Sequence, residues 1–236
     1  MTITEVMVWA VRVCVRLPGV RESLSTVVLG LWAVLSVVVV GYTLGAHLTR
    51  LPAPPASDPA LARGLRALFP AIGGRLPGGV GGGPRDLLVV HVLYDRCGCS
   101  ARVGKSLELR GARLGVREMV LVVSDDVGAD GVAGTDWPAI SRLKAAGFPV
   151  VTLATTEVAD RLHVQAVPLL VIVEGPDRVL YAGGYTDGRD DPRLQDQRLI
   201  AEAGAGRAPA ALPIFGCATA SALQKQLDPL GIKYGR

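Results

Sequence analysis

The sequence predicts an α/β domain preceded by one long apolar helix. Between residues 86 and 190, nearly continuous apolar runs alternate with stretches of helical spacing. Apolar runs of this kind are typical of strands that are covered on both faces, and their alternation with helices is the pattern of an α/β fold. Upstream of this region, no Asp, Glu, Lys or Arg occurs from Ser23 to Thr49.

The uncharged segment predicts a transmembrane helix at residues 23–49, because about 20 apolar residues suffice to cross a bilayer. The chain is 50% hydrophobic and only 19% charged, which agrees with a membrane segment. A buried helix of a soluble core and a cleaved signal peptide are the alternatives; the length of the run and the lack of a clear cleavage site favour an uncleaved anchor. Residues 1–22 form a membrane-proximal segment, and we expect the C-terminal domain outside the cytoplasm.

Residues 50–85 predict a flexible linker rich in Pro and Gly. Within it, Ser57 is a candidate cap for a short helix from Asp58 to Leu68. The Gly-rich end is not a phosphate-binding loop, because no strand precedes it and no Lys-Ser/Thr pair follows.

The alternating pattern assigns the elements of the domain at residues 86–190. We expect strands at 87–94, 116–124 and 148–153, helices at 101–113, 137–146 and 156–162, and a hairpin over 169–185. Residues 191–236 form a C-terminal extension with a helix at 218–227.

Two cysteines separated by one glycine follow the first strand. Cys97 and Cys99 lie where a strand runs into a helix, and reactive groups of α/β folds lie at the carboxyl ends of strands. The chain has four cysteines, too few for a disulfide framework, and the other two are Cys14 and Cys217. The pair therefore predicts redox or metal chemistry.

The segment LLVVHVLYDRCGCS resembles the active-site strand and loop of the thioredoxin superfamily. The resemblance implies that Cys97 is the nucleophile, that Ser100 takes the place of the resolving cysteine, and that Cys99 takes the place of a proline. It places His91 where thioredoxins bury an acid that handles protons.

A second motif supports this resemblance. LHVQAVPLL is similar to the segment before the fourth thioredoxin strand, which makes Pro168 the expected cis-proline facing the reactive cysteine. The implied fold is a central mixed β-sheet flanked by helices. The loop, the YAGGYT segment and the late Phe-Gly-Cys217 also resemble bacterial RedB-type thioredoxin-like proteins.

The implied activity is thiol–disulfide exchange with protein thiols or disulfides, without a cofactor. A helix N-terminus and the adjacent Arg96 are expected to lower the pKa of Cys97 and make it the attacking thiolate. Cys99 is the nearest resolving thiol, and Cys217 competes with it if the tail folds over the loop. His91 is either a proton relay or a structural core histidine.

Two other functions remain open. Cys97 and Cys99, with His91 or His163, are candidate ligands for copper(I), and the loop also resembles that of iron–sulfur-binding monothiol glutaredoxins. The third possibility is a non-catalytic docking module. Nucleic-acid binding is not expected, because the net charge of +4 is spread over isolated Arg residues.

Overall fold

A computed structural model of the chain describes residues 24–56, 58–68, 87–113, 116–126, 136–175, 178–229, 231, 233 and 234. It divides the chain into two compact units, residues 1–49 and residues 50–236. The predicted segment at residues 1–22 and the Gly-rich part of the linker lie outside the described residues.

The described residues of the first unit form the helix α2 (Leu24–Leu48). Its described side chains include many exposed valines and leucines and the exposed Trp32. In the part of the chain that the structure describes, no helix is long and apolar enough to cross a membrane. The anchor at residues 23–49 stays a prediction from the sequence.

The second unit alternates strands and helices, as the sequence predicts. Its strands are β1 (Leu87–Tyr94), β2 (Arg117–Ser124), β3 (Val150–Ala154), β4 (Ala166–Val167), β5 (Leu169–Glu174), β6 (Arg178–Gly183) and β7 (Cys217–Ala218). Its helices are α3 (Pro59–Ala67), α4 (Gly98–Arg110), α5 (Ala139–Ala145), α6 (Thr155–Leu162), α7 (Asp196–Gly204) and α8 (Ser221–Leu227). The predicted strands and helices up to residue 183 are confirmed to within a few residues.

A mixed five-stranded sheet in the order β3-β2-β1-β5-β6 forms the centre of this unit. β1 runs parallel to β2, and β2 runs parallel to β3. On the other side, β1 pairs antiparallel with β5, and β5 pairs antiparallel with β6. The predicted class, a central mixed sheet flanked by helices, is confirmed.

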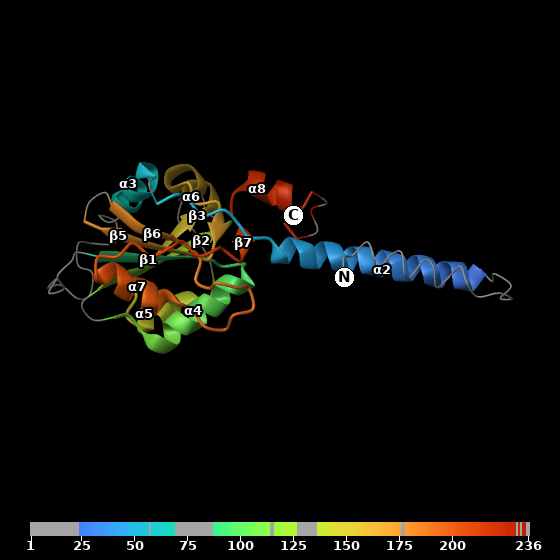
Figure 1. Cartoon of the computed structure of the whole chain (residues 1–236), viewed down its shortest axis with the longest axis horizontal. Helices are drawn as coiled ribbons and strands as arrows, with labels where there is room; N and C mark the ends of the chain where they lie inside the picture. Colours follow the sequence, from blue (N-terminus) through green and yellow to red (C-terminus); the bar gives the residue numbers. More distant parts are fainter. Residues whose placement is uncertain are drawn as a thin grey trace. The chain divides into compact units, whose positions relative to one another are not determined.

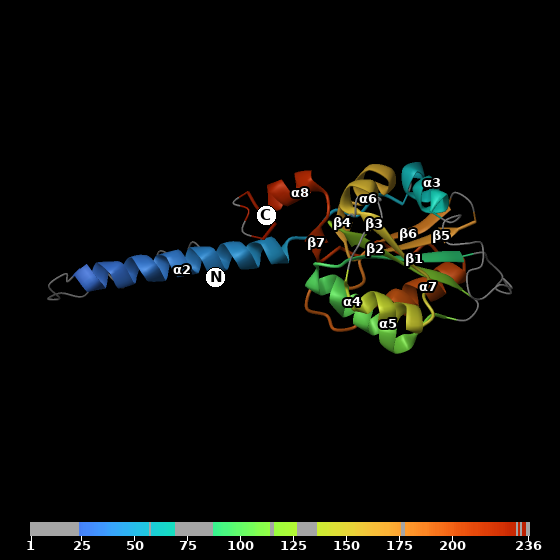
Figure 2. The ribbon, with the colours of Figure 1, turned by 180° about the vertical axis from the view of Figure 1, so that it is seen from behind.

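Helices cover both faces of the sheet. α3 and α6 lie on one face, and α4, α5 and α7 lie on the other (Figure 1), and the view from behind shows the same two layers (Figure 2). Because successive strand residues point to opposite faces, β1 divides its side chains between two cores. Leu88, Val90 and Val92 belong to the first core, and Val89 and Leu93 to the second.

The first part of the predicted linker at residues 50–85 contains the expected short helix, which is α3, but this part packs against the domain. Residue Leu51 forms a bridge to Ile214, with its backbone N–H 2.9 Å from the Ile214 carbonyl oxygen. α3 then buries Leu61 and Leu65 in the first core, because these leucines share one face of the helix. The cap of α3 is Asp58, whose Oδ1 accepts the N–H of Ala60 at 2.8 Å.

The predicted boundary between a domain and an extension at residue 191 is wrong. α7 packs Leu199, Ile200 and Ala203 into the second core, so the chain beyond 191 completes the fold. Further on, β7 pairs antiparallel with β4, and Cys217 lies opposite Val167. The sequence predicts none of α7, β4 and β7.

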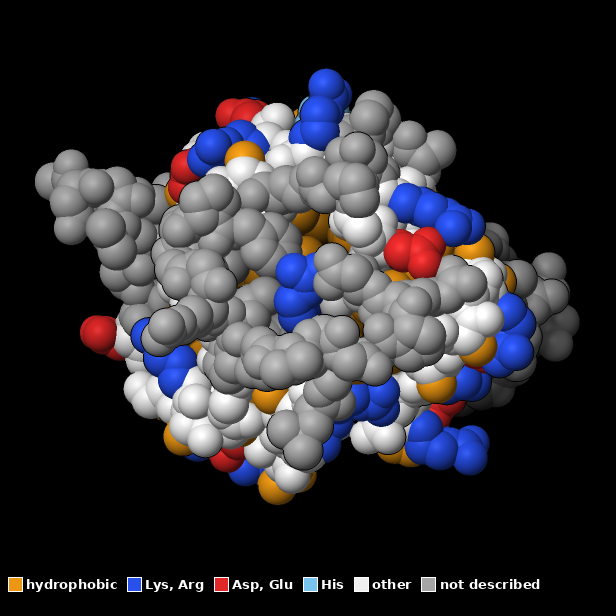
Figure 3. Space-filling view, turned by 90° about the vertical axis from the view of Figure 1, so that its left-hand side faces the viewer, with side chains coloured by type: hydrophobic (Ala, Val, Ile, Leu, Met, Phe, Trp, Pro, Cys, Tyr) orange, Lys and Arg blue, Asp and Glu red, His pale blue; other side chains and the backbone are white. Residues whose placement is uncertain are grey.

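Charged side chains are interspersed on the described surface. Figure 3 shows Lys and Arg distributed over one face, several of them beside Asp or Glu. Exposed pairs include Arg178 with Glu174 at 2.8 Å and Arg142 with Glu108 at 2.9 Å. Exposed pairs of this kind contribute about 0–1 kcal/mol each, so the two cores carry most of the stability.

Close packing at Gly216 provides a test of the β4–β7 pairing. A Cβ at Gly216 would overlap the carbonyl oxygen of Val167 and Cδ of Pro168, whereas a Cβ at Gly98 meets nothing within 4 Å. We expect Gly216→Ala to lower the free energy of unfolding by about 1–3 kcal/mol, because the backbone must shift. The matched variant Gly98→Ala should leave it nearly unchanged in urea titrations. Equal stability of the two variants would contradict the pairing.

Candidate functional site

The candidate site begins where β1 ends. The chain turns at Asp95 and Arg96, and the extended residue Cys97 is the N-cap of α4. The N–H of Cys97 donates to the carbonyl oxygen of Tyr94 at 3.1 Å, which closes the turn. Cys97 is only 1% exposed, whereas Cys99, on the first turn of α4, is half-buried.

Ser100 holds this turn in place. Its side chain is fully buried, and its Oγ accepts the backbone N–H of Tyr94 at 3.0 Å. A hydroxyl at this position therefore links the first turn of α4 to the end of β1. Ser100 therefore has a structural role in the described chain.

The third thiol arrives from the C-terminal tail. β7 places Cys217 opposite Val167, and the N–H of Thr219 donates to the carbonyl oxygen of Gln165 at 2.8 Å. The Val167–Pro168 peptide bond is cis, which confirms the geometry predicted for Pro168. The tail thus folds over the loop, as the competing assignment for Cys217 requires.

The thiols of Cys97, Cys99 and Cys217 form one hydrogen-bonded group, and all three are free. The hydrogen bond from Cys97 lowers the pKa of Cys217, and this effect outweighs burial. The same bond raises the pKa of Cys97, whose S–H donates the hydrogen bond to Cys217. The pKa of Cys99 is raised by its bond to Cys97 and by burial. The hydrogen bonds thus favour the thiolate form at Cys217 and the thiol form at Cys97 and Cys99.

The structure corrects the pKa direction expected for Cys97. Arg96 donates two hydrogen bonds to the carboxylate of Asp126, at 2.9 and 2.8 Å, and lies 3.9 Å from Asp125. The charge expected to act on Cys97 is thus compensated by two carboxylates. The N–H of Ser100 favours a Cys97 thiolate, but it does not outweigh the bond to Cys217 and burial, so the pKa of Cys97 rises.

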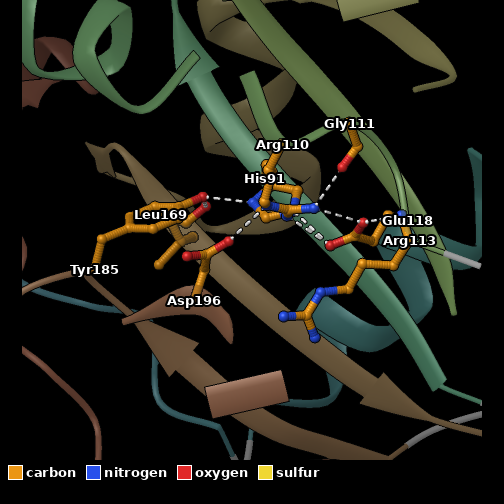
Figure 4. Close-up of polar contacts among 8 residues, drawn as sticks. All are labelled: His91, Arg110, Gly111, Arg113, Glu118, Leu169, Tyr185 and Asp196. Carbon is orange, nitrogen blue, oxygen red and sulfur yellow. Dashed lines mark hydrogen bonds and ion pairs between the residues drawn. The ribbon is translucent and has the colours of Figure 1, made fainter. Parts of the chain in front are cut away.

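His91 belongs to a buried polar network on the other face of β1 (Figure 4). Its Nδ1 lies 2.9 Å from the Tyr185 hydroxyl, and its Nε2 lies 3.4 Å from Oε1 of Glu118. Arg110, near the end of α4, reaches Glu118 at 2.7 Å and Asp196 of α7 at 3.0 Å. The network ties α4, β1, β2 and α7 together inside the second core.

Strand alternation explains why His91 does not meet the thiols. Cys97 packs in the first core with Val90 and Val92, whereas His91 lies between Val89 and Leu93 and shares their face. The ring contacts described for His91 are to Tyr185, Glu118, Arg110 and Phe148. This arrangement favours the interpretation of His91 as a structural histidine.

The two candidate histidine ligands have partners other than the thiols. His163 ends α6 and places Nδ1 3.0 Å from Oδ2 of Asp58. Within the described residues, no group of three or more His, Cys, Asp or Glu side chains is arranged to hold a metal ion.

The turn that follows α8 is not predicted from the sequence. Tyr234 accepts the N–H of Ala218, next to Cys217, at 3.0 Å, and the charge of Lys233 acts on Cys217 and Cys99. These residues lie near the end of the chain in a polar segment without a motif, so no local signal identifies them.

No protein-family profile and no curated protein sequence matches this chain. Solved structures that are similar to it include a hypothetical protein of Sinorhizobium meliloti 1021, with 20% identity and a TM-score of 0.45 over 57% of this chain and 79% of that one. An uncharacterized conserved protein of Geobacillus kaustophilus has 17% identity and a TM-score of 0.37 over 58% of this chain and 78% of that one.

The network around Glu118 makes the free energy of unfolding depend on pH. Burial raises the pKa of Glu118, but its bonds to His91 and Arg110 outweigh this and bring the pKa to about 2 from an ordinary 4.5. The carboxylate therefore stabilises the fold above about pH 4.5, and roughly 3 kcal/mol is lost as the pH falls toward 2. We expect Glu118→Gln to cost about 3–5 kcal/mol near neutral pH, and less in acid.

Urea unfolding at a series of pH values measures this dependence. Glu157→Gln is the matched control, because its ion pair with Arg161 at 3.3 Å is exposed and should contribute little at any pH. A cost of Glu118→Gln that is the same at neutral and acidic pH would refute the assignment.

Proposed function

We propose that this chain is a thiol–disulfide oxidoreductase of thioredoxin-like fold that uses Cys97 and Cys217 as its redox pair. The substrate class is a disulfide or dithiol of another protein. The proposal combines the motif resemblance around Cys97 and Pro168 with the chemistry of the thiol group.

The hydrogen bond between Cys97 and Cys217 is the observation that carries the proposal. These residues are far apart in the sequence, yet the β4–β7 pairing brings their thiols into direct contact. Two thiols in contact can close a disulfide with little backbone movement. One of them is readily ionised, and the thiolate is the form that reacts with disulfides.

The thiols of this chain and the disulfide of the partner are enough to balance the atoms and electrons of the exchange. One thiolate of the pair attacks a sulfur of the partner's disulfide, the partner's S–S bond breaks, and its first sulfur leaves as a thiolate that takes up a proton. The second thiol of the pair then loses its proton and attacks the mixed disulfide. The partner leaves with two thiols, and this chain holds a Cys97–Cys217 disulfide and has given up two electrons. The reverse sequence oxidises a partner dithiol.

The other predicted site residues have supporting positions in this proposal. Cys99 bonds to Cys97 and is a third thiol that can exchange with the pair. Pro168 follows Val167, the register partner of Cys217, and so borders the reacting sulfurs. Ser100 holds the loop by accepting a hydrogen bond from the N–H of Tyr94. Arg96 holds its exposed side by donating to the carboxylate of Asp126.

Disulfide mapping of the full chain tests the proposal. The protein would carry Cys14→Ser, so that Cys97, Cys99 and Cys217 remain, and would be equilibrated with glutathione buffers of graded potential. We expect mass spectrometry to find a Cys97–Cys217 disulfide that forms and reduces reversibly. Cys97→Ser or Cys217→Ser should lower the rate of disulfide reduction by about 100-fold or more, because no resolving thiol remains in contact.

Cys99→Ser is the matched control, and it should retain most of the activity. A Cys97–Cys99 disulfide with full activity in Cys217→Ser would refute the assigned pair. Three thiols that stay free at every potential would refute the oxidoreductase and leave a docking module, and bound copper or iron in the same samples would favour metal handling.

A further inference from the structure

The last turn of the described chain is closed by a buried carboxylate. Asp228 follows α8 and is only 4% exposed. Its Oδ2 accepts the backbone N–H of Lys233 at 2.6 Å and that of Tyr234 at 2.8 Å. Hydrogen bonds from two N–H groups to one buried carboxylate fix the backbone on which Lys233 is carried.

This turn is attached to the strand that carries Cys217. The N–H of Ala218 donates to the Tyr234 hydroxyl at 3.0 Å. The carbonyl oxygen of Ala218 accepts a hydrogen bond from Nε2 of Gln224, on α8, also at 3.0 Å. The residue next to Cys217 is therefore held on both sides by the segment that ends in Lys233 and Tyr234.

The same contacts place Lys233 in the turn that is attached to the residue after Cys217. Nζ of Lys233 lies 4.9 Å from the centre of the Tyr234 ring, whose hydroxyl contacts Ala218. The Cys97 hydrogen bond lowers the pKa of Cys217, burial opposes it, and the charge of Lys233 lowers that pKa further. The charge of Lys233 also acts in this direction on Cys99.

Other ionisable groups also lie around the thiols, and Asp95, with a buried side-chain oxygen, precedes Cys97 by two residues. Cys97 and Cys99 face Cys217 from the start of α4, and Arg102 of α4 acts on Cys99. Arg96 is occupied by Asp126. Among the described residues, Lys233 is the cation whose charge acts on Cys217.

We propose that Lys233 is a positioning residue of the redox site, which holds Cys217 as the attacking thiolate while Cys97 serves as the resolving thiol. This inference rests on the proposed function and assigns the order in which the two sulfurs react. Cys217 attacks the partner's disulfide and releases the partner's first thiolate. Cys97, which is 1% exposed, then attacks the sulfur of Cys217 and releases the partner's second thiolate. The half-buried Cys217 is the sulfur that a partner reaches first.

The pH profile of alkylation tests this order without a redox partner. The reduced full chain with Cys14→Ser would be treated with iodoacetamide from about pH 5 to about pH 10, and each thiol would be followed by peptide mass spectrometry. In Lys233→Gln we expect the midpoint for Cys217 to move up by as much as about one pH unit, a several-fold slower reaction at neutral pH. Lys233→Arg should restore the midpoint.

Lys225→Gln is the matched control, because it removes the same charge from α8, and its midpoint should equal that of the unsubstituted chain. If Lys233→Gln only loosened the tail, Cys217 would become more accessible, and its alkylation rate at the high-pH plateau would rise. Loss of the charge moves the midpoint and leaves the plateau. An unmoved midpoint, or an equal shift in Lys225→Gln, would overturn the role of Lys233.

The two proposals fail in different ways. A reversible Cys97–Cys217 disulfide with an unmoved Cys217 midpoint would overturn the role of Lys233 and keep the oxidoreductase. A midpoint that depends on Lys233 in a chain that forms no disulfide would overturn the oxidoreductase and keep Lys233 as the group that ionises Cys217.

Discussion

The short antiparallel pairing of β4 with β7 is the contact on which the candidate site depends. It sets Cys217 opposite Val167 and next to the cis-proline, and thereby against Cys97. Because side chains alternate along a strand, a slip of one residue in this pairing would turn Cys217 away and bring Gly216 or Ala218 to its place. Gly216 admits the close approach, since any side chain there meets the β4 backbone.

The frame that supports this pairing is the mixed sheet with its two cores. The first core holds Cys97 and the strands that lead to it, so the reactive end is built on buried apolar side chains. The second core contains an ionic network in which Arg110 joins Glu118 to Asp196. Buried charges tolerate little displacement because each needs its partners. The network therefore fixes α4, and with it the N-terminal end that Cys97 caps.

The sequence predicts the elements that carry a long periodic signal. β1 is eight consecutive buried residues, and its predicted bounds are confirmed. β4 and β7 have two residues each, which is too short for any periodicity, so the pairing that defines the site is invisible in the sequence. The raised pKa of Cys97 has no local signal in the sequence, because it comes from the hydrogen bond to the distant Cys217 and from burial, while Arg96 pairs with Asp126, 30 residues away. The sequence predicts α3 as a short helix, but the Pro and Gly around it indicate a flexible linker, so the burial of its leucines in the first core is not expected.

The position of Cys217 near the end of the chain has a consequence for biosynthesis. Cys97 and Cys99 leave the ribosome long before Cys217 and Lys233 are translated, and chains begin to fold from their N-terminal parts. During that interval the first two thiols are neighbours without their third partner. Under the proposed Cys97–Cys217 pairing, a disulfide that forms within the loop during that interval joins Cys97 to Cys99, and translation of Cys217 supplies the thiol that can reopen it by exchange.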